Sequence, residues 1–182
     1  MPTILPIMKD RRSIRKYKRE PISDQMVKHL LEAVQCSQSW GNSQCWELVM
    51  VEDPSMKESI QKAVPTQNPA FHAIVDAPLI VVFCAKLGVS GQLNGTLISK
   101  PGDWFMFDAG LAVQNLCTCA HDLGLGTVVV GWLNHHEVKT IIDLPEGYEA
   151  IALIPVGHPG HKGSSPARKE IHEFVHKNRF GD

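Results

Sequence analysis

The stretch from Trp104 to Leu123 constrains the fold more than any other part of the chain. Its residues are apolar on nearly every side of a helical projection, and the exceptions are Asp108, Gln114 and Asn115. A helix of this kind is buried in the core of a domain, and Gly124 supplies a helix stop directly after it. The rest of the chain must therefore provide enough apolar surface to cover this helix.

Composition predicts one globular domain covering residues 1–182. The chain has 182 residues, 43% hydrophobic and 20% charged, which is enough for a sizeable core. A net charge of −1 argues against a general nucleic-acid-binding protein. No run of 18 apolar residues and no secretory signal is present, so we expect a cytoplasmic protein that does not span a membrane.

Cysteine usage agrees with a reducing compartment. The count is odd and no C-x-x-C pair occurs, so we expect reduced, mostly buried thiols rather than disulfides. The five are Cys36, Cys45, Cys84, Cys117 and Cys119.

Caps and periodicity predict three shorter helices. Ser23 is a suitable N-cap for the first, and Asp53-Pro54 opens the second with proline at an early helical position. Asn134 with Glu137 three residues later resembles a capping box for the third. The helices predicted in this way cover residues 23–34, 53–64 and 134–142.

Short apolar and β-branched runs predict four strands. These are Leu48–Val51, Leu79–Cys84, Thr127–Val130 and Ala150–Val156. Residues 86–102 are predicted to form a long loop of the kind that serves as a lid or binding segment. Because strands and helices alternate irregularly, we expect an α+β fold with helices around a sheet.

The stretch Arg11-Arg12-Ser13-Ile14-Arg15, followed by Tyr17, is the first candidate for chemistry. Guanidinium groups match phosphate oxygens two at a time, and serine adds a short hydroxyl donor. A basic run of this length is also compatible with an ordinary solvated surface. Spacing alone does not decide between an anion site and a solvated face.

Motifs along the whole chain resemble those of the nitroreductase family of FMN-dependent oxidoreductases. The first is Arg-x-Ser-x-Arg with its following aromatic residue, and the others come in the family's order. They are Ser-x-x-Asn-Ser-Gln-x-Trp at 39–46, the central helix from Asp108, Gly124-Leu-Gly126, Val130-Gly131, Pro155-Val-Gly157, and Pro166-Ala-Arg168-Lys169 before the closing tail at 171–179. Two departures are Cys45, where the family usually has proline, and the segment 65–71, which carries no match to the family's Asn and Lys.

The resemblance implies an FMN site, a central mixed or antiparallel sheet surrounded by helices, and an intertwined homodimer. Arg11, Arg168 and Lys169 would hold the phosphate, and Arg15 would favour negative charge on the reduced ring. Gly131 would permit backbone to approach the ring closely. The residues implied to contact FMN are Arg11, Arg12, Ser13, Arg15, Ser37, Gln38, Ser39, Asn42, Val128, Val129, Val130, Gly131, Arg168 and Lys169.

The implied activity is hydride transfer from NAD(P)H to a nitroaromatic, a quinone or a similar small acceptor, with no side chain needed as acid or base. Two alternatives remain open: a family member that acts on flavin itself or on halogenated aromatics, and a flavin-binding sensor or storage protein without turnover. The sequence does not decide between NADH and NADPH.

Two other motifs carry weaker interpretations. His172-Glu173-Phe174-Val175-His176 matches H-E-x-x-H, which on a helix places two imidazoles on one face for zinc. No third ligand follows it, and its apolar residues favour a docking stripe, so we expect no metal site. Gly124-Leu-Gly126 lies between a helix and a strand, the reverse of the order that a dinucleotide fingerprint requires.

Overall fold

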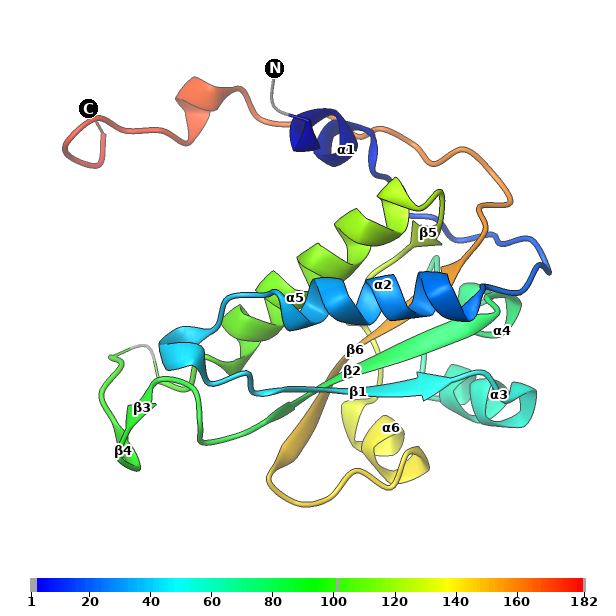
Figure 1. The fold of residues 1–182 in the computed structure, drawn as a ribbon, viewed down its shortest axis with the longest axis horizontal. Coiled ribbons are helices and arrows are strands. Elements are labelled where there is room, and N and C mark those ends of the chain that lie inside the picture. Colours follow the sequence, from blue (N-terminus) through cyan, green and yellow to red (C-terminus); the bar gives the residue numbers. More distant parts are fainter. Residues whose placement is uncertain (1–2, 101, 182) are drawn as a thin grey trace.

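Four strands form the central sheet of the computed structural model, which describes residues 3–100 and 102–181 (Figure 1). Their order is β1 (Trp46–Val51), β2 (Leu79–Lys86), β6 (Tyr148–Gly157) and β5 (Gly126–Thr127), and all neighbours are antiparallel. A separate two-stranded hairpin consists of β3 (Gln92–Leu93) and β4 (Thr96–Leu97).

Helices cover both faces of this sheet, which confirms the expected α+β class (Figure 1). They are α1 (Ile4–Asp10), α2 (Asp24–Gln35), α3 (Pro54–Lys62), α4 (Ala73–Asp76), α5 (Phe105–Asp122) and α6 (His135–Ile141), with 3₁₀ turns η1 (Trp40–Asn42) and η2 (Ile171–Glu173). Helices α2 and α5 pack in one core cluster, and α3, α4 and α6 pack in the other.

Strand β2 is buried on both faces, which explains its unbroken apolar sequence. Leu79, Val81 and Phe83 belong to the cluster with α2 and α5, whereas the alternate residues from 80 to 84 belong to the opposite cluster. Each large apolar side chain buried in this way contributes about 1.5–3 kcal/mol. The strand thus joins the two helical layers into one domain.

The predicted caps form with the expected geometry. The Ser23 side chain accepts a hydrogen bond from Met26 N at 3.3 Å, and Asp53 accepts one from Met56 N at 2.8 Å. Asn134 caps α6, but its own backbone N–H donates to Ala63 O at 2.7 Å. The third helix therefore has only half of a capping box, because the Asn134 backbone N–H binds the Ala63 carbonyl and not the Glu137 side chain.

The strand predicted for Thr127–Val130 is shorter in the structure and begins one residue earlier. Strand β5 ends at Thr127, and the chain meets β6 again only at the bridge between Val130 and Leu153. Continuing the β5–β6 register places Val128 opposite Pro155, which has no N–H to donate. The Pro155 carbonyl instead accepts a hydrogen bond from Tyr17 Oη at 3.1 Å. The ladder is therefore interrupted between Thr127 and Val130.

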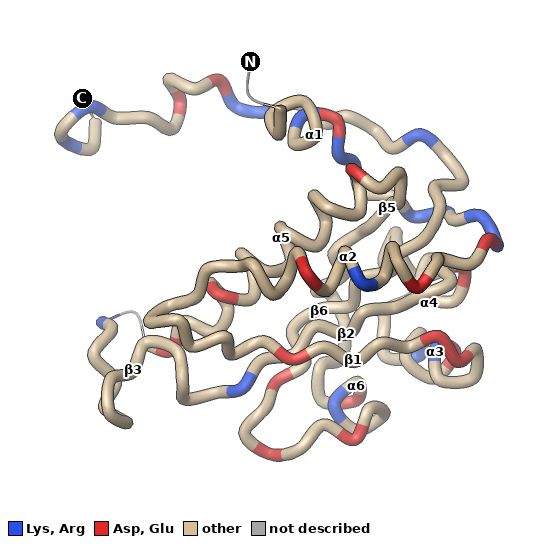
Figure 2. The backbone as a smooth tube through the Cα atoms, viewed as in Figure 1, with Lys and Arg blue, Asp and Glu red and all other residues tan. Residues whose placement is uncertain are grey.

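Helix α5 is covered on one side only, which corrects the expectation of a helix buried all round. Its buried side includes Ala109, Leu116 and Ala120, whereas Met106 and Phe107 are each 58% exposed. Between Asp108 and Asp122 the helix has no Lys, Arg, Asp or Glu (Figure 2). Neither α5 nor any other helix in the described ranges combines the length and apolar character that crossing a bilayer requires.

Two further expectations need correction. Residues 86–102 are not a plain loop: Lys86 ends β2, and the β3–β4 hairpin follows, with residue 101 outside the described ranges. The hairpin forms because Asn94-Gly95 supplies the two positive φ angles, 50° and 76°, of a tight turn. Among the cysteines, Cys36 is exposed directly after α2 and Cys119 is half-buried, whereas the other three are buried as expected.

We expect the protein to lose stability above about pH 9. Burial raises the pKa of the Cys45 thiol to about 11 and that of Cys84 to about 12, from an ordinary value of 9.0. The folded state therefore holds protons that the unfolded state releases, so stability is full below about pH 9 and falls as the pH rises. Between about pH 9 and 11 each thiol costs about 1.4 kcal/mol per pH unit. Urea unfolding at pH 8 and pH 10.5 measures the difference.

The matched control is Cys84→Ala. This variant is expected to be less stable at pH 8, because Cys84 is fully buried, but to show a shallower fall with pH. Equal unfolding free energies of the unaltered protein at the two pH values would contradict the expectation.

Candidate functional site

The arginine segment lies extended along the edge of the sheet beyond β5. Helix α1 ends at Asp10, and the backbone of the next residue, Arg11, is no longer helical. Ser13 then forms a parallel bridge with Thr127, and Ile14 N donates to Thr127 O at 2.9 Å. Hydrogen bonds from Lys18 N to His158 O and from Gly160 N to Lys16 O, at 2.9 and 2.8 Å, tie the same segment to the chain that follows β6.

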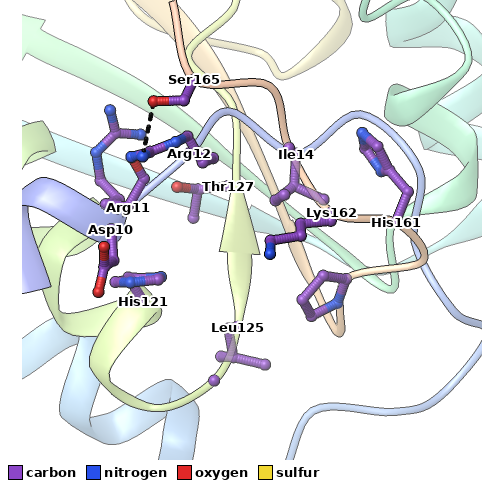
Figure 3. Close-up of a pocket in the computed structure, with 13 residues that line it drawn as sticks. Asp10, Arg11, Arg12, Ile14, His121, Leu125, Thr127, His161, Lys162 and Ser165 are labelled. Carbon is purple, nitrogen blue, oxygen red and sulfur yellow. Dashed lines mark hydrogen bonds between the residues drawn. The ribbon is translucent and has the colours of Figure 1, made fainter.

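Two glycines allow this close approach. A Cβ atom on Gly163 would lie 2.5 Å from the Arg12 Cβ, and one on Gly126 would lie 2.7 Å from the Ile14 Cβ. Both distances are far below van der Waals contact, so only glycine permits the observed packing. The Arg12 guanidinium also donates to Ser165 Oγ at 2.9 Å (Figure 3). The segments 11–17 and 157–165 therefore form one clasp.

A pocket of about 730 Å³ opens inside this clasp (Figure 3). Its walls come from the arginine segment, the end of α5, β5 and the segment after β6. The lining residues are Asp10, Arg11, Arg12, Ile14, His121, Gly124, Leu125, Thr127, Pro159, His161, Lys162, Gly163 and Ser165. With two arginines and a lysine against one carboxylate, the pocket suits an anionic group such as a phosphate.

The loop from Ser37 to Asn42 lies at the other end of α5 (Figure 1). Its Trp40 N donates to the Asp108 carboxylate at the start of α5, whereas His121 at the helix end lines the pocket. From Asp108 to His121 the helix rises about 20 Å, at 1.5 Å per residue. The structure thus places the arginine segment and the Ser37–Asn42 loop, which both carry predicted FMN contacts, far apart within one chain.

The members of this loop differ in exposure. Ser37 is buried, accepts a hydrogen bond from Asn115 Nδ2 at 2.9 Å and donates to Ala33 O at 3.3 Å. Gln38 and Asn42 are exposed, and Ser39 is half-buried. The Gln38 and Asn42 side chains are therefore accessible to a ligand or a second chain. Ser39 Oγ accepts a hydrogen bond from Gln44 N at 2.9 Å and keeps its own hydroxyl hydrogen to donate, whereas Ser37 anchors the loop to α5.

Val128 to Gly131 run beside the interrupted ladder. Val128 and Val130 are buried, whereas Val129 is 51% exposed and Gly131 is exposed. Within residues 3–100 and 102–181, no hydrogen bond engages the backbone of Val128 or Val129. Their amide and carbonyl groups are therefore free to bind a ligand.

The remaining predicted residues do not line the pocket. Arg15 is half-buried, directly beyond Ile14. Arg168 and Lys169 are exposed on the extended tail, and the Arg168 guanidinium donates to nearby carbonyls, Pro166 O at 3.1 Å and Ala167 O at 3.3 Å. Neither residue is among those that line the pocket, and Figure 2 shows the C-terminal tail passing beside α1.

Sequence reasoning missed Lys162 and the role of Asp108. Lys162 lies in irregular chain after β6 and belongs to no recognisable motif, and the pairing of segments 11–17 and 157–165 brings it to the pocket. Asp108 was counted among the polar exceptions of an apolar helix, but it is 0% exposed and binds several loop groups. An isolated acid in an apolar helix is the signal that could have identified it.

The H-E-x-x-H motif does not lie on an α-helix. His172 lies in η2, which ends at Glu173, and His176 follows in irregular chain, so the two imidazoles do not share a helical face. In the part of the chain that the structure describes, no group of three or more His, Cys, Asp or Glu could hold a metal ion.

Comparison with known proteins adds a family match over most of the chain. The sequence model of the nitroreductase family matches residues 8–158. An FMN reductase (NAD(P)H) of Bacillus subtilis is 27% identical over 197 aligned positions, covering 99% of this chain and 75% of the relative. An NADPH-dependent oxidoreductase of Staphylococcus epidermidis is 27% identical over 195 positions, covering 97% and 74%.

A solved structure agrees with the sequence relatives. The NADPH:FMN oxidoreductase from Vibrio harveyi complexed with NAD+ superposes with a TM-score of 0.82 at 25% identity, covering 98% of this chain and 78% of that one. The superposition therefore spans nearly the whole chain.

Proposed function

Because the chain belongs to the nitroreductase family, we propose that it is an FMN-dependent oxidoreductase that passes hydride from NAD(P)H to a small acceptor such as a nitroaromatic or a quinone. The observation that carries this proposal is the cation-lined pocket in the clasp of segments 11–17 and 157–165. The names of the relatives, an FMN reductase and an NADPH-dependent oxidoreductase, support the same activity.

Arg11, Arg12 and Lys162 hold the FMN phosphate in this proposal. Arg12 is fixed from two sides, by Ser165 and by the Arg11 carbonyl at 2.8 Å, so its guanidinium loses little freedom when it binds an anion. Lys162 adds a charge from the opposite wall. Arg168 and Lys169 supplement this set from the tail, which requires the tail to fold over the pocket of its own or of a second chain.

The isoalloxazine ring lies against the chain from Val128 to Gly131. The unpaired amide and carbonyl groups of Val128 and Val129 offer it hydrogen bonds, and the space at Gly131 is open, with no atom within 4 Å of a Cβ placed there. Arg15 supplies the positive charge that favours the reduced ring. Bound FMN would accept hydride from NAD(P)H and deliver it to the acceptor.

Two copies of the chain build each site in this proposal. The loop residues Gln38, Ser39 and Asn42 lie at the far end of α5 from the pocket, so they reach the flavin only from a second chain. The uncovered side of α5, with Met106 and Phe107, and the apolar tail supply the surface for such a contact. An isologous homodimer would cover this surface and complete two identical sites.

The test of the proposed function is a spectrum followed by a turnover assay. Purified protein, or protein loaded with FMN, is expected to show a bound-flavin absorbance band and to oxidise NADH or NADPH with menadione or nitrofurazone as acceptor. Arg11→Ala should release FMN, because a phosphate contact is lost. Lys28→Ala, which removes an exposed cation on α2 that pairs with Glu32 at 3.8 Å, is the matched control and should keep FMN.

Flavin binding without NAD(P)H oxidation would instead support a sensor or storage protein. A chain that binds no FMN under any loading condition would contradict the proposal.

A further inference from the structure

Asp108 is a fully buried carboxylate in the first turn of α5, and two segments converge on it: the loop at residues 37–45 and the chain just before β3. Its Oδ1 accepts a hydrogen bond from Trp40 N at 2.9 Å. Its Oδ2 accepts from Ser43 Oγ at 2.9 Å and from Ser90 Oγ at 2.6 Å. Within the described ranges no Lys, Arg or His lies within ion-pair distance of it.

Burying a carboxylate without a cation is costly unless hydrogen bonds satisfy it. Here the donors are a backbone N–H and two hydroxyls, and the Cys45 thiol lies at 3.7 Å from Oδ2. Burial and the adjacent carboxylate keep the pKa of Cys45 high, at about 11, so the thiol keeps its proton near neutral pH and can donate to Asp108. A hydrophobic residue at position 108 would avoid the cost but would release all of these contacts.

The loop that these bonds hold is conformationally strained. Gly41, Asn42 and Gln44 have φ angles of 54°, 57° and 46°, in the left-handed region that favours glycine. Glycine and asparagine adopt this region readily, whereas Gln44 held there costs about 1–2 kcal/mol. The Asp108 contacts to Trp40 and Ser43 lie on either side of Gly41 and Asn42, so they fix the backbone that presents the Asn42 side chain.

We propose that Asp108 is a positioning residue that sets the shape of the 37–45 loop for the flavin site of a second copy of the chain. Asp108 does not touch that flavin; it acts through the loop that bears Gln38, Ser39 and Asn42. The same carboxylate accepts a hydrogen bond from Ser90, which lies just before the β3–β4 hairpin. The hairpin and the loop are therefore both held by the Asp108 carboxylate. This inference rests on the shared site proposed above.

The test mixes two impaired variant chains, unfolds and refolds them together, and measures the activity that returns. Each such mixture is called a cross. The variants are Asp108→Ala, Arg11→Ala and Asn42→Gly; glycine at position 42 removes the side chain and keeps the positive φ. We expect Asp108→Ala alone to lose at least about tenfold in flavin-dependent turnover. Crossed with Arg11→Ala it should regain about a quarter of wild-type activity, since random pairing gives about half mixed dimers with one intact site each.

Crossed with Asn42→Gly, the Asp108→Ala chain should regain nothing, because both lesions then damage the same half of every site. A merely structural role predicts a different pattern. If Asp108→Ala disturbed its whole chain, the arginine half of that chain would fail too, and the cross with Arg11→Ala would not recover.

The cross of Arg11→Ala with Asn42→Gly tests the shared site independently of the role of Asp108. If that cross recovers activity but Asp108→Ala fails to complement Arg11→Ala, the role of Asp108 is overturned and the shared site stands. If neither cross recovers, the shared site itself fails. Recovery between Asp108→Ala and Asn42→Gly would also overturn the proposal.

Asp108→Asn serves if the alanine variant does not fold. It keeps an oxygen for Trp40 N and replaces Oδ2 by an amide, to which the Ser43 and Ser90 hydroxyls can turn their lone pairs. It is expected to retain most of the activity and to give the same pattern of crosses at a smaller amplitude. If Asp108→Asn keeps full activity, its crosses have no loss to recover, and Ser43→Ala and Ser90→Ala then serve as the test. If both of these variants also keep full activity, the carboxylate has no positioning role.

Discussion

Co-refolded Arg11→Ala and Asn42→Gly chains are expected to recover about a quarter of wild-type turnover, although each variant alone is nearly inactive. Arg11 lines the pocket at the end of α5, and Asn42 lies in the loop that packs on the start of α5. The helix between them rises about 20 Å, which separates the two residues within one chain. If two chains build each site, a mixed dimer has one doubly damaged site and one intact site.

The expected fraction follows from symmetry. Random pairing of equal amounts gives about half mixed dimers, and each of these carries one intact site out of two, so about a quarter of all sites are wild type. The measurement is steady-state NAD(P)H oxidation after refolding with FMN. The same chains mixed without unfolding, and each parent refolded alone, are the controls. A refolded mixture with only the mean activity of its parents would mean that each site is built within one chain.

The fold was predictable where local physics decides. Ser23 and Asp53 cap the helices they were predicted to cap, because their side chains and the N–H groups they accept from are three residues apart. The run from Leu79 to Cys84 was predictable as a strand because six apolar residues in a row require burial on both faces of a sheet.

The errors have long-range causes. Nothing local in Thr127-Val-Val-Val130 shows that the strand is interrupted at Val128, because the cause is Pro155 on the paired strand. Helix α5 was expected to be buried on all sides because its sequence is apolar, but a single chain covers only one of its sides. An apolar sequence indicates that a surface is buried, but it does not show whether the same chain or a second copy buries it.

The candidate site was predictable in its motifs and not in its assembly. The arginine segment was identified by residue type and family resemblance, and the structure adds the partners that make it a pocket: Lys162 and the glycines at positions 126 and 163. The role of Asp108 depends on donors at positions 40, 43 and 90, which meet only in the folded chain.

Removing residues 171–182 is expected to weaken association of two chains by at least about 100-fold without loosening the fold of each. This part of the tail carries four large apolar side chains that are more than half exposed: Ile171 at 72%, Phe174 at 58%, Val175 at 54% and Phe180 at 93%. Its hydrogen bonds are local, such as Val175 N to Ile171 O and Gly181 N to the His176 ring. A single chain therefore gains little stability from it.

Burial of the same side chains against a second chain would stabilise the dimer. Full burial of a large apolar side chain contributes about 1.5–3 kcal/mol, and ordering the tail opposes part of this gain. A net loss of about 2.8 kcal/mol per dimer corresponds to the 100-fold weakening. Sedimentation velocity over a range of concentrations measures the change, and urea unfolding at a concentration where the chain is monomeric measures the stability of the fold.

Full-length Lys177→Ala is the matched control, because it alters an exposed charge in the tail and leaves the apolar side chains in place. Since the proposed sites need two chains, turnover per chain of the truncated protein should fall on dilution, with the same midpoint as dissociation. Turnover that stays constant while the dimer dissociates would show that a monomer has a complete site. A truncated chain that remains as dimeric as the full-length protein would show instead that the open side of α5, with Met106 and Phe107, is sufficient for association.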